Sequence, residues 1–544
     1  MPVHSFENPV TTLKNVLFIM CDQLRWDYLS CYGHPYLRTP NIDWLATQGV
    51  RFDRAYVQSP ICGPSRMSTY TGRYVISHGS SWNGFPLRVG ELTLGDHLRP
   101  LGVDTVLIGK THMRADTEGM ARYGIEPGTI IGARLAECGF DVFERHEGLH
   151  PDQSNHAPPR YNDYLKNKGY DDPNPWNTRA NGVVPKAGET GEGWFLKYSD
   201  RPANIAEQDS ETPYLTRRFM EFVDSRTDDT PWLCHLSFIK PHWPYIVPAP
   251  YHDMHGPDTW LAPVRSEAER RDPHPVYQAF MHARVSRAFC RDEVRAAVMP
   301  AYMGLIKQID DQMGLLWQFL RDRGLMDNTM IVFTSDHGDY LGDHWLGEKE
   351  LFHDPSVKVP LIICDPRTEA DAARGTVSNA LVEAIDLVPT FVSAFGAEPA
   401  PNRLEGHSLA PLLHGRVPGH WRQVAISEYD YAATPAREIL GTGPACSRAI
   451  MAVDARWKYI FFEQFRAMLF DLENDPDELV DLGADPAYSD VCDVMRGHVF
   501  EWARRQRQRI TTPDSQILAA SEKRTALGQG ILIGFWSEEE LDEL

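Results

Sequence analysis

Positive charge is scarce in this sequence: 54 Lys and Arg stand against 75 Asp and Glu, which gives a net charge of −21. Nucleic acids and anionic membranes are bound by exposed positive charge, so we expect neither as a partner. The same balance opposes long-range attraction of an anionic substrate. Any attraction for an anion must therefore come from a metal ion or from a local cluster of Lys, Arg and His.

The sequence also lacks long apolar runs and paired cysteines. The apolar segment 16–20 has the length of a strand, and residues 1–14 show no basic stretch followed by an apolar run and a cleavage site. Nine Cys, an odd number without paired spacing, favour reduced thiols over a disulfide framework. These features predict a cytoplasmic protein without a membrane span.

A chain of 544 residues exceeds one ordinary core, so we expect two domains. Five short apolar runs predict strands buried on both faces, as in an α/β fold. They cover residues 15–20, 104–109, 231–239, 329–334 and 359–364. Between the third and fourth runs, apolar residues from Tyr302 to Leu320 follow helical spacing, and Gly324 suits the end of that helix.

The pattern changes after residue 415. Short strand-like segments at 424–428, 449–453 and 458–462 predict a small antiparallel sheet, and 491–509 predicts a closing helix. We therefore divide the chain into a catalytic domain (1–415), a small-sheet domain (416–515) and a tail (516–544). The apolar patch 531–536 in the tail predicts contact with a neighbouring subunit, and thus a homo-oligomer.

Ionisable residues follow four of the five predicted strands. They are Asp22 with Gln23, Lys110 with His112, His242, and Asp336 with His337. Ligands of open α/β sheets bind beyond the carboxyl ends of the strands, so this pattern predicts a site there. Each residue also has an ordinary alternative. Lysines such as Lys110 and Lys349 are mostly solvated, His242 could cap a rigid turn, and Asp336-His337-Gly338 could be a plain turn.

The most specific segment is CGPSRMSTYTGR, residues 62–73. Pro64 suits the first turn of a helix and Gly72 its end, which places Cys62 at a helix N-terminus. Free backbone N–H groups there, with Arg66 one turn further on, favour an anion. Taken alone, a single Cys is more often a small buried apolar residue.

This segment resembles the sulfatase motif, in which the Cys is oxidised after translation to formylglycine. Further similar motifs accompany it: Asp22-Gln23, Gly109-Lys110-x-His112, Asp336-His337-Gly338, and Phe470-Asp471-Leu472 with Asp475-Pro476. The resemblance covers almost the whole chain. It implies an alkaline-phosphatase-like α/β fold, with a large mixed sheet flanked by helices and a smaller C-terminal α+β domain that carries an antiparallel sheet.

The resemblance implies one divalent metal ion, with ligands from Asp22, Gln23, Cys62, Asp336 and His337. Many sulfatases carry two Asp residues after the first strand and often Asn after the later Asp, whereas this chain has Gln23 and His337. Losing a carboxylate and gaining an imidazole shifts the expected preference from Ca²⁺ toward Mn²⁺ or Zn²⁺.

The chemistry implied by the family starts from the aldehyde at residue 62, which hydrates to a geminal diol. The metal activates one hydroxyl, Asp336 accepts its proton, and the hydroxyl attacks sulfur. His242 is the candidate acid for the leaving alcohol, and His112 the base that helps to expel sulfate. Cations hold the non-bridging oxygens, and the candidates are Lys110, Lys349 and Arg66. A formylglycine-generating maturation enzyme is an implied partner.

A subgroup of the superfamily, the phosphonate monoester hydrolases and related phosphodiesterases, shares Gln23, Asn83, His242 and Lys349 with this chain. Substrate contacts are expected from Asn83, Lys110, His242 and Lys349. The subgroup usually has neutral Tyr and Thr where this chain has Lys110 and His112. A sulfate monoester presents three non-bridging oxygens to such cations, so we expect sulfate esters first, phosphonate monoesters or phosphodiesters second, and activity on both.

Two other functions stay open. If Cys62 is not oxidised, the chain could be a metal-containing binding protein, and transfer of the covalent sulfate to another alcohol would make it a transferase.

The alcohol part of an anionic ester substrate is expected to be selected by loops 116–128 and 148–203. These loops contain aromatic residues that suit a pocket wall, namely Tyr161, Tyr164, Trp176 and Trp194.

Overall fold

A computed structural model describes residues 13–148, 160–186, 191–506 and 510–524. The five predicted strands form the contiguous centre of an eight-stranded sheet with the order β5-β4-β6-β1-β7-β8-β2-β9. They are β1 (Asn15–Asp22), β4 (Asp104–Gly109), β6 (Trp232–Pro241), β7 (Thr329–Ser335) and β8 (Leu361–Cys364). The first four run parallel, whereas β8 is antiparallel to β7.

Three outer strands were missed by the sequence analysis: β5 (Asp141–Arg145), β2 (Val50–Phe52) and β9 (Thr376–Ser378). They are short, and β5 and β9 are partly exposed. By contrast, every residue of β1 is buried, and its side chains alternate between two hydrophobic clusters. Phe18 and Met20 belong to one cluster, Leu17 and Ile19 to the other. The continuous apolar run therefore reflects burial on both faces of the sheet.

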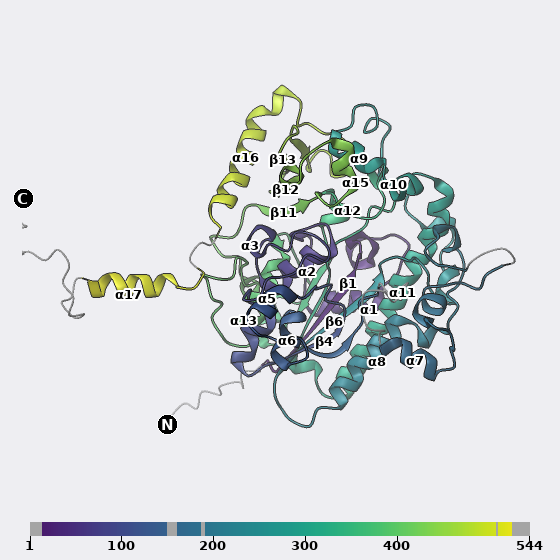
Figure 1. Cartoon of the computed structure of the whole chain (residues 1–544), viewed down its shortest axis with the longest axis horizontal. Helices are drawn as coiled ribbons and strands as arrows, with labels where there is room; N and C mark the ends of the chain where they lie inside the picture. The colour runs from purple at the N-terminus through teal and green to yellow at the C-terminus, as the bar shows by residue number, and fades with distance from the viewer. Residues whose placement is uncertain (1–12, 149–159, 187–190, 507–509, 525–544) are drawn as a thin grey trace, which may run out of the picture.

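Helices cover both faces (Figure 1). One face carries α1 (Pro40–Gln48), α8 (Glu211–Asp224) and α11 (Asp292–Asp322), and the other carries α2 (Cys62–Thr71), α4 (Leu94–Leu98) and α13 (Leu387–Ala394). The predicted helix is α11, which begins ten residues before its predicted apolar stripe. Gly324, with φ +64°, adopts the left-handed conformation expected just beyond it. The other helices are α3 (Val75–His78), α5 (Thr117–Arg122), α6 (Ile130–Ala136), α7 (Arg160–Asn167), α9 (Pro275–Met281), α10 (Arg284–Phe289), α12 (Asp354–Val357), α14 (Ala410–Leu413) and α15 (Pro435–Leu440).

The C-terminal part forms a four-stranded antiparallel sheet, covered by α16 (Ser489–Arg504). Its strands are β11 (Ala425–Asp430), β12 (Arg448–Val453), β13 (Trp457–Phe462) and β14 (Met468–Asp471). The first three were predicted, and β14 was missed. One hydrophobic cluster includes residues on both sides of position 415, such as Val388 and Tyr429. The predicted division at 415 thus separates two sheets that share a core, and as a domain boundary it stays a prediction.

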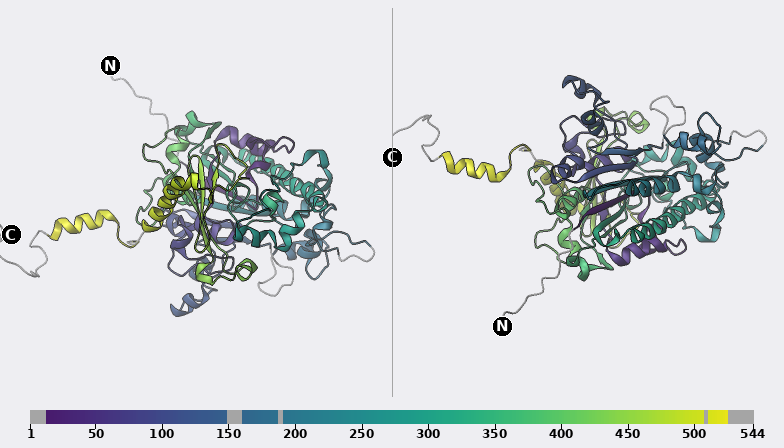
Figure 2. Two further views of the ribbon diagram at one scale, coloured as in Figure 1. Left: turned by 90° about the horizontal axis from the view of Figure 1, so that it is seen from above. Right: turned by 90° about the horizontal axis from the view of Figure 1, so that it is seen from below.

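The last described element is α17 (Asp514–Arg524), which stands away from the body of the molecule (Figures 1 and 2). The predicted tail patch 531–536 lies outside the described residues. Within the described residues, no helix has both the length and the apolar character that a membrane span requires. All nine Cys are unpaired thiols, in agreement with the prediction.

Candidate active site

The predicted site residues meet at one edge of the large sheet. Strands β4, β6, β1 and β7 are parallel neighbours, so their carboxyl ends lie side by side. Each end delivers part of the site, and α2 brings Cys62 to the same place. The residues brought together are Asp22, Gln23, Cys62, Lys110, His112, His242, Asp336, His337 and Lys349.

Two glycines in the predicted motifs are required by close backbone approach. A Cβ on Gly109 would lie 2.0 Å from the carbonyl oxygen of Ser237, and one on Gly338 would lie 1.9 Å from that of Pro355. Gln23 and His112 have positive φ angles of 65° and 56°, which are costly for residues with a side chain. Such strained positions concentrate at functional sites, where the surrounding structure holds them in place.

Cys62 is the first residue of α2 and is buried. Its Sγ lies 3.0 Å from His337 Nε2, 3.4 Å from Lys349 Nζ and 3.6 Å from Asp22 Oδ1. Burial raises the pKa of the thiol, but the charges of Lys349, Lys110 and His337 outweigh this and hold it well below its ordinary value. The pocket therefore stabilises negative charge at residue 62.

The ligand atoms of Asp22, Cys62, Asp336 and His337 all lie within 4.8 Å of one another, and all four residues are buried. His337 Nδ1 lies 2.9 Å from the carbonyl oxygen of Gly338. A proton on Nδ1 satisfies that carbonyl and leaves Nε2 free to coordinate, as in many metal sites. Two carboxylates and an imidazole fit a divalent cation.

Arg66 is fully buried behind this cluster, with Nε 2.7 Å from Asp336 Oδ2 and Nη2 3.2 Å from Asp22 Oδ2. Its Nη1 donates to the carbonyl oxygen of Lys110 and to Ser237 Oγ. We expected Arg66 to hold substrate oxygens. In this structure the guanidinium is committed to the carboxylates, so Arg66 positions them, and its contact with substrate stays a prediction.

Lys110 and Lys349 are buried, which excludes the alternative of solvated surface lysines. Lys110 Nζ lies 2.6 Å from Asp22 Oδ2, so much of its charge is already compensated. Lys349 Nζ lies 2.9 Å from Gln23 Oε1 and 3.2 Å from His242 Nε2. Burial lowers the pKa of Lys349, but Cys62 and nearby carboxylates raise it above its ordinary value, so the side chain is a cation.

His242 is neutral in the substrate-free protein. Burial and the charge of Lys349 lower its pKa to about 4. Its Nδ1 lies 2.7 Å from the carbonyl oxygen of Trp243, so Nε2 accepts from Lys349. The predicted proton donation by His242 therefore needs a proton source, and Lys349 is in contact with it.

Asn83 Oδ1 accepts a hydrogen bond of 2.7 Å from the Gly63 backbone N–H. That N–H is one of the helix N-terminal donors expected to attract an anion, and it is already hydrogen-bonded to Asn83. Asn83 thus fixes the start of α2 next to Cys62. Contact between Asn83 and substrate stays a prediction.

Comparison with known proteins agrees with this geometry. The Sulfatase family model matches residues 14–397, and the model of the N-sulphoglucosamine sulphohydrolase C-terminal region matches residues 342–505. The chain belongs to the sulfatase family. Its fold is the alkaline-phosphatase-like fold of that family, as predicted from the motifs.

Sulfatases and phosphonate monoester hydrolases both occur among the relatives. The chain is 30% identical to the multifunctional alkaline phosphatase superfamily protein PehA of Trinickia caryophylli, over 92% of this chain and 97% of that one. It is 27% identical to an arylsulfatase of Clostridium perfringens, over 89% and 92%. The phosphonate monoester hydrolase SpPMH from Silicibacter pomeroyi superposes with a TM-score of 0.79 at 28% identity, over 92% of this chain and 97% of that chain.

Three residues around the candidate active site were missed by the sequence analysis. Glu147 accepts hydrogen bonds from the backbone N–H of Thr111 and of His112, and so fixes the loop after β4. Asp339 and Tyr245 bond to Gln23. Asp339 lies three residues after Asp336 in a segment already recognised as similar to the family. Glu147 follows β5, which had no sequence signal.

The aromatic residues of the predicted substrate loops lie in different surroundings, and the role of the loops stays a prediction. Tyr161 and Trp176 are fully buried in the core, where their polar atoms bond to the carbonyl oxygen of Asp209 and to Glu211, so they line no pocket. Trp194 is partly exposed and its ring centre lies 5.3 Å from that of Trp243. Trp243 in turn packs on His242, with 4.6 Å between ring centres. Trp194 and Trp243 therefore lie beside the candidate proton donor.

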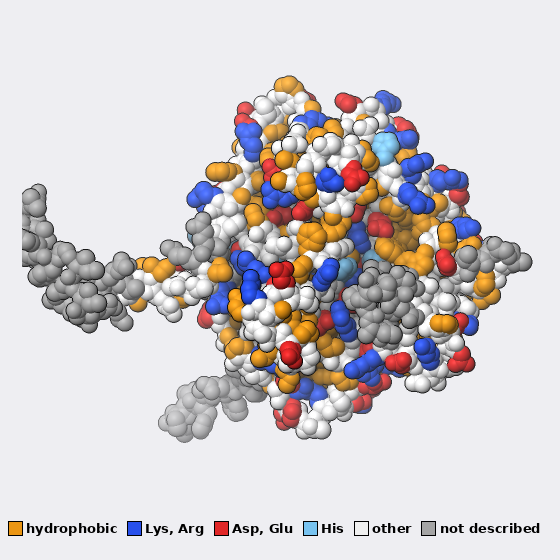
Figure 3. Space-filling model, viewed as in Figure 1, with side chains coloured by type: hydrophobic (Ala, Val, Ile, Leu, Met, Phe, Trp, Pro, Cys, Tyr) orange, Lys and Arg blue, Asp and Glu red, His pale blue; other side chains and the backbone are white. Residues whose placement is uncertain are grey.

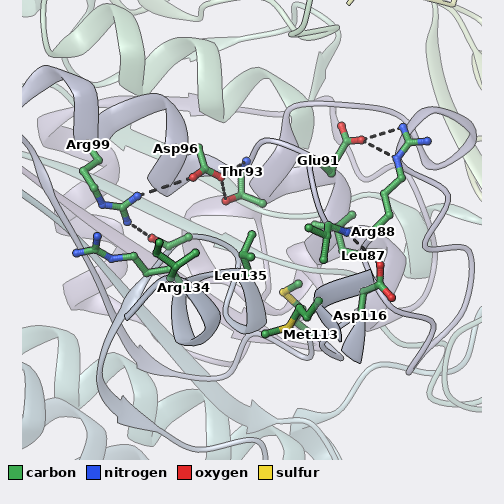
Figure 4. Close-up of a pocket in the computed structure, with 14 residues that line it drawn as sticks. Leu87, Arg88, Glu91, Thr93, Asp96, Arg99, Met113, Asp116, Arg134 and Leu135 are labelled. Atoms are coloured by element: carbon green, nitrogen blue, oxygen red, sulfur yellow. Dashed lines mark hydrogen bonds and ion pairs between the residues drawn. The ribbon is translucent and has the colours of Figure 1, made fainter. Parts of the chain in front are cut away.

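A second pocket lies apart from the sulfatase site, between α4 and the α5–α6 segment (Figure 4). Four of its charged lining residues form two ion pairs: Arg88 Nη2 is 3.0 Å from Glu91 Oε2, and Arg99 Nη1 is 3.8 Å from Asp96 Oδ1. The surface is also mixed in sign, because Lys and Arg alternate with Asp and Glu over the described part of the face in Figure 3.

Proposed function

We propose that this protein hydrolyses sulfate monoesters with a formylglycine made from Cys62 and one divalent metal ion. The observation that carries the proposal is the placement of Cys62 Sγ against His337, Lys349 and Asp22 in one buried pocket. The ion would be held by Asp22, Asp336, His337 and residue 62, and would lower the pKa of a hydroxyl there. Formylglycine, in its hydrated form, supplies that hydroxyl and a second one for product release.

The protein's own side chains supply charge and protons. Lys349 is the cation best placed for a non-bridging oxygen of the ester, since Lys110 is bound to Asp22. His112 contacts residue 62 and is the candidate base for product release. Arg66 holds Asp22 and Asp336 in place. A maturation enzyme that oxidises Cys62 is part of the proposal.

Proton transfer to the leaving alcohol would run through His242, which is neutral in the substrate-free protein and must take up a proton before it donates one. We expect His242→Ala to lower kcat by about a hundredfold or more for a sulfate ester with a poorly leaving alkyl alcohol. The loss should be much smaller for a nitrophenyl sulfate, whose leaving group needs no proton. Steady-state kinetics with both esters measure this. An equal loss for both would assign His242 another role.

Phosphonate monoesters and phosphodiesters are the second candidate substrates. The similarity to the phosphonate monoester hydrolase SpPMH favours phosphonate monoesters, and Gln23, Asn83, His242 and Lys349 favour both classes. Lys110 and His112 near residue 62 are where the chain departs from that subgroup, and a sulfate monoester presents three non-bridging oxygens to this side of the pocket, so we place sulfate first. We expect kcat/KM to be higher for an aryl sulfate than for a phenylphosphonate monoester. A preference of several orders of magnitude for the phosphonate would reverse the order.

The remaining expectations stay proposals. If residue 62 is an unmodified Cys in protein from its host, a metal-containing binding protein becomes the better interpretation, and intact-mass measurement tests this.

A cytoplasmic location is proposed from the unpaired thiols. A homo-oligomer is proposed from α17, which stands apart with Leu518 66% exposed; molar mass by light scattering tests it.

A further inference from the structure

Gln23 is held by a buried carboxylate that the proposed mechanism does not use. Its Nε2 donates to Asp339 Oδ2 at 2.6 Å and to the Tyr245 hydroxyl oxygen at 3.2 Å. Gln23 and Asp339 are both fully buried. Their bond joins the residue after β1 to the loop after β7, which lie next to each other because β1 and β7 are paired.

Asp339 acts only as an acceptor in this arrangement. Its Oδ2 also accepts from the Tyr245 hydroxyl at 2.5 Å, and its Oδ1 accepts from the backbone N–H of Leu341 at 3.0 Å. Burial raises the pKa of Asp339 above its ordinary value, while the bonds from Tyr245, Gln23 and Leu341 lower it. Through these three bonds Asp339 presents acceptor oxygens to the groups behind the pocket, Gln23 among them.

The acceptor oxygen of Asp339 fixes which way the Gln23 amide faces. With Nε2 on Asp339, Oε1 faces Lys349 Nζ at 2.9 Å, and that ammonium lies 3.4 Å from Cys62 Sγ. The reversed amide would set Oε1 against a carboxylate and Nε2 against an ammonium, which are both repulsive contacts. The metal-binding pocket thus receives a neutral amide oxygen, and the carboxylate stays on the far side of Gln23.

We infer that Asp339 is a positioning residue that sets the metal preference of the site by orienting Gln23. The inference rests on the proposed metal-dependent function. Ca²⁺ is favoured by several carboxylates, whereas an imidazole with fewer carboxylates suits Mn²⁺ or Zn²⁺. Of this pair, Gln23 faces the pocket that contains His337, and the carboxylate of Asp339 lies behind it. The pair therefore adds an amide, and no further carboxylate, to the pocket.

Exchanging the two side chains tests the inference. Asp339→Asn replaces one acceptor oxygen by an N–H donor, so the Gln23 amide is no longer held in one orientation, and we expect the variant to weaken Mn²⁺ binding by about tenfold to a hundredfold. Gln23→Glu alone sets two carboxylates within contact distance and should lower the melting temperature. The double variant Gln23→Glu/Asp339→Asn restores one amide and one carboxylate, now with the carboxylate toward the pocket. It should regain stability and shift the ratio of Ca²⁺ to Mn²⁺ affinity at least tenfold toward Ca²⁺.

The measurement is calorimetric titration of the metal-free full-length protein with Mn²⁺ or Ca²⁺ alone, so that no substrate is involved. Asp343→Asn is the matched control, because Asp343 is also buried in this loop but bonds to Arg25 and to the Val264 backbone N–H. We expect it to leave the ratio of the two affinities unchanged.

Mn²⁺ binding within twofold of wild type in Asp339→Asn would overturn the inference, as would an unchanged affinity ratio or an unfolded double variant. If the wild-type protein binds metal and hydrolyses esters while the variants keep its preference, this inference fails and the proposed function survives. If the wild-type protein binds neither ion and hydrolyses no ester, both fail.

Discussion

Replacing Cys62 with Ala is expected to lower kcat/KM for a sulfate ester by at least about a thousandfold, because the nucleophile is lost. The loss should come without unfolding, since Cys62 is one small buried side chain at the start of α2. Activity toward an aryl sulfate and the melting temperature measure the two effects. Cys234→Ala is the matched control, because Cys234 is equally buried but lies inside β6, away from the pocket.

Cys62→Ser sharpens this test. An unmodified Ser has one hydroxyl, so it lacks the second hydroxyl that allows formylglycine to expel sulfate. We expect one turnover and then a stable protein that has gained one sulfuryl group, visible by intact mass. The wild-type protein from its host should be lighter than its sequence by about 18 Da, the loss on oxidation of Cys to formylglycine. Full activity with an unaltered thiol at residue 62 would contradict the proposed mechanism.

Removal of the metal ion is expected to lower kcat by at least about a thousandfold while the fold survives. The loss follows because nothing else in the pocket lowers the pKa of a hydroxyl at residue 62 to the same degree. The fold should survive because Arg66 and Lys110 remain bound to Asp22, and Arg66 to Asp336, so the buried carboxylates keep cationic partners.

Dialysis against a chelator, followed by activity and circular dichroism, measures both effects. Added Mn²⁺ or Zn²⁺ should restore more activity than Ca²⁺ at equal concentration. Full activity in protein shown by elemental analysis to be free of metal would contradict the metal-dependent mechanism. Collapse of the far-ultraviolet spectrum on chelation would show instead that Arg66 and Lys110 do not suffice to hold the carboxylates.

The strands were predictable where burial on both faces leaves a continuous apolar run. All five such runs became neighbours in the sheet, whereas β2, β5 and β9 escaped because they are short and lie toward its two edges. The direction of β8 was equally beyond sequence reasoning, since an apolar run looks the same in parallel and antiparallel pairing. Tyr161 and Trp176 were misplaced for a related reason: spacing does not show whether an aromatic residue in a loop faces solvent or the core.

The sequence by itself determined the chemical inventory: a Cys in a sulfatase motif, two metal-binding carboxylates, and lysines and histidines after apolar strands. Sequence order carries this information because a polar residue directly after a buried strand must lie at the end of that strand. Only the tertiary structure decided which of these residues contact one another. It set Arg66 behind the carboxylates, made Lys349 the partner of His242, and placed Asp339 behind Gln23. Those contacts join residues far apart in the chain, and their geometry depends on strand order and on packing between elements.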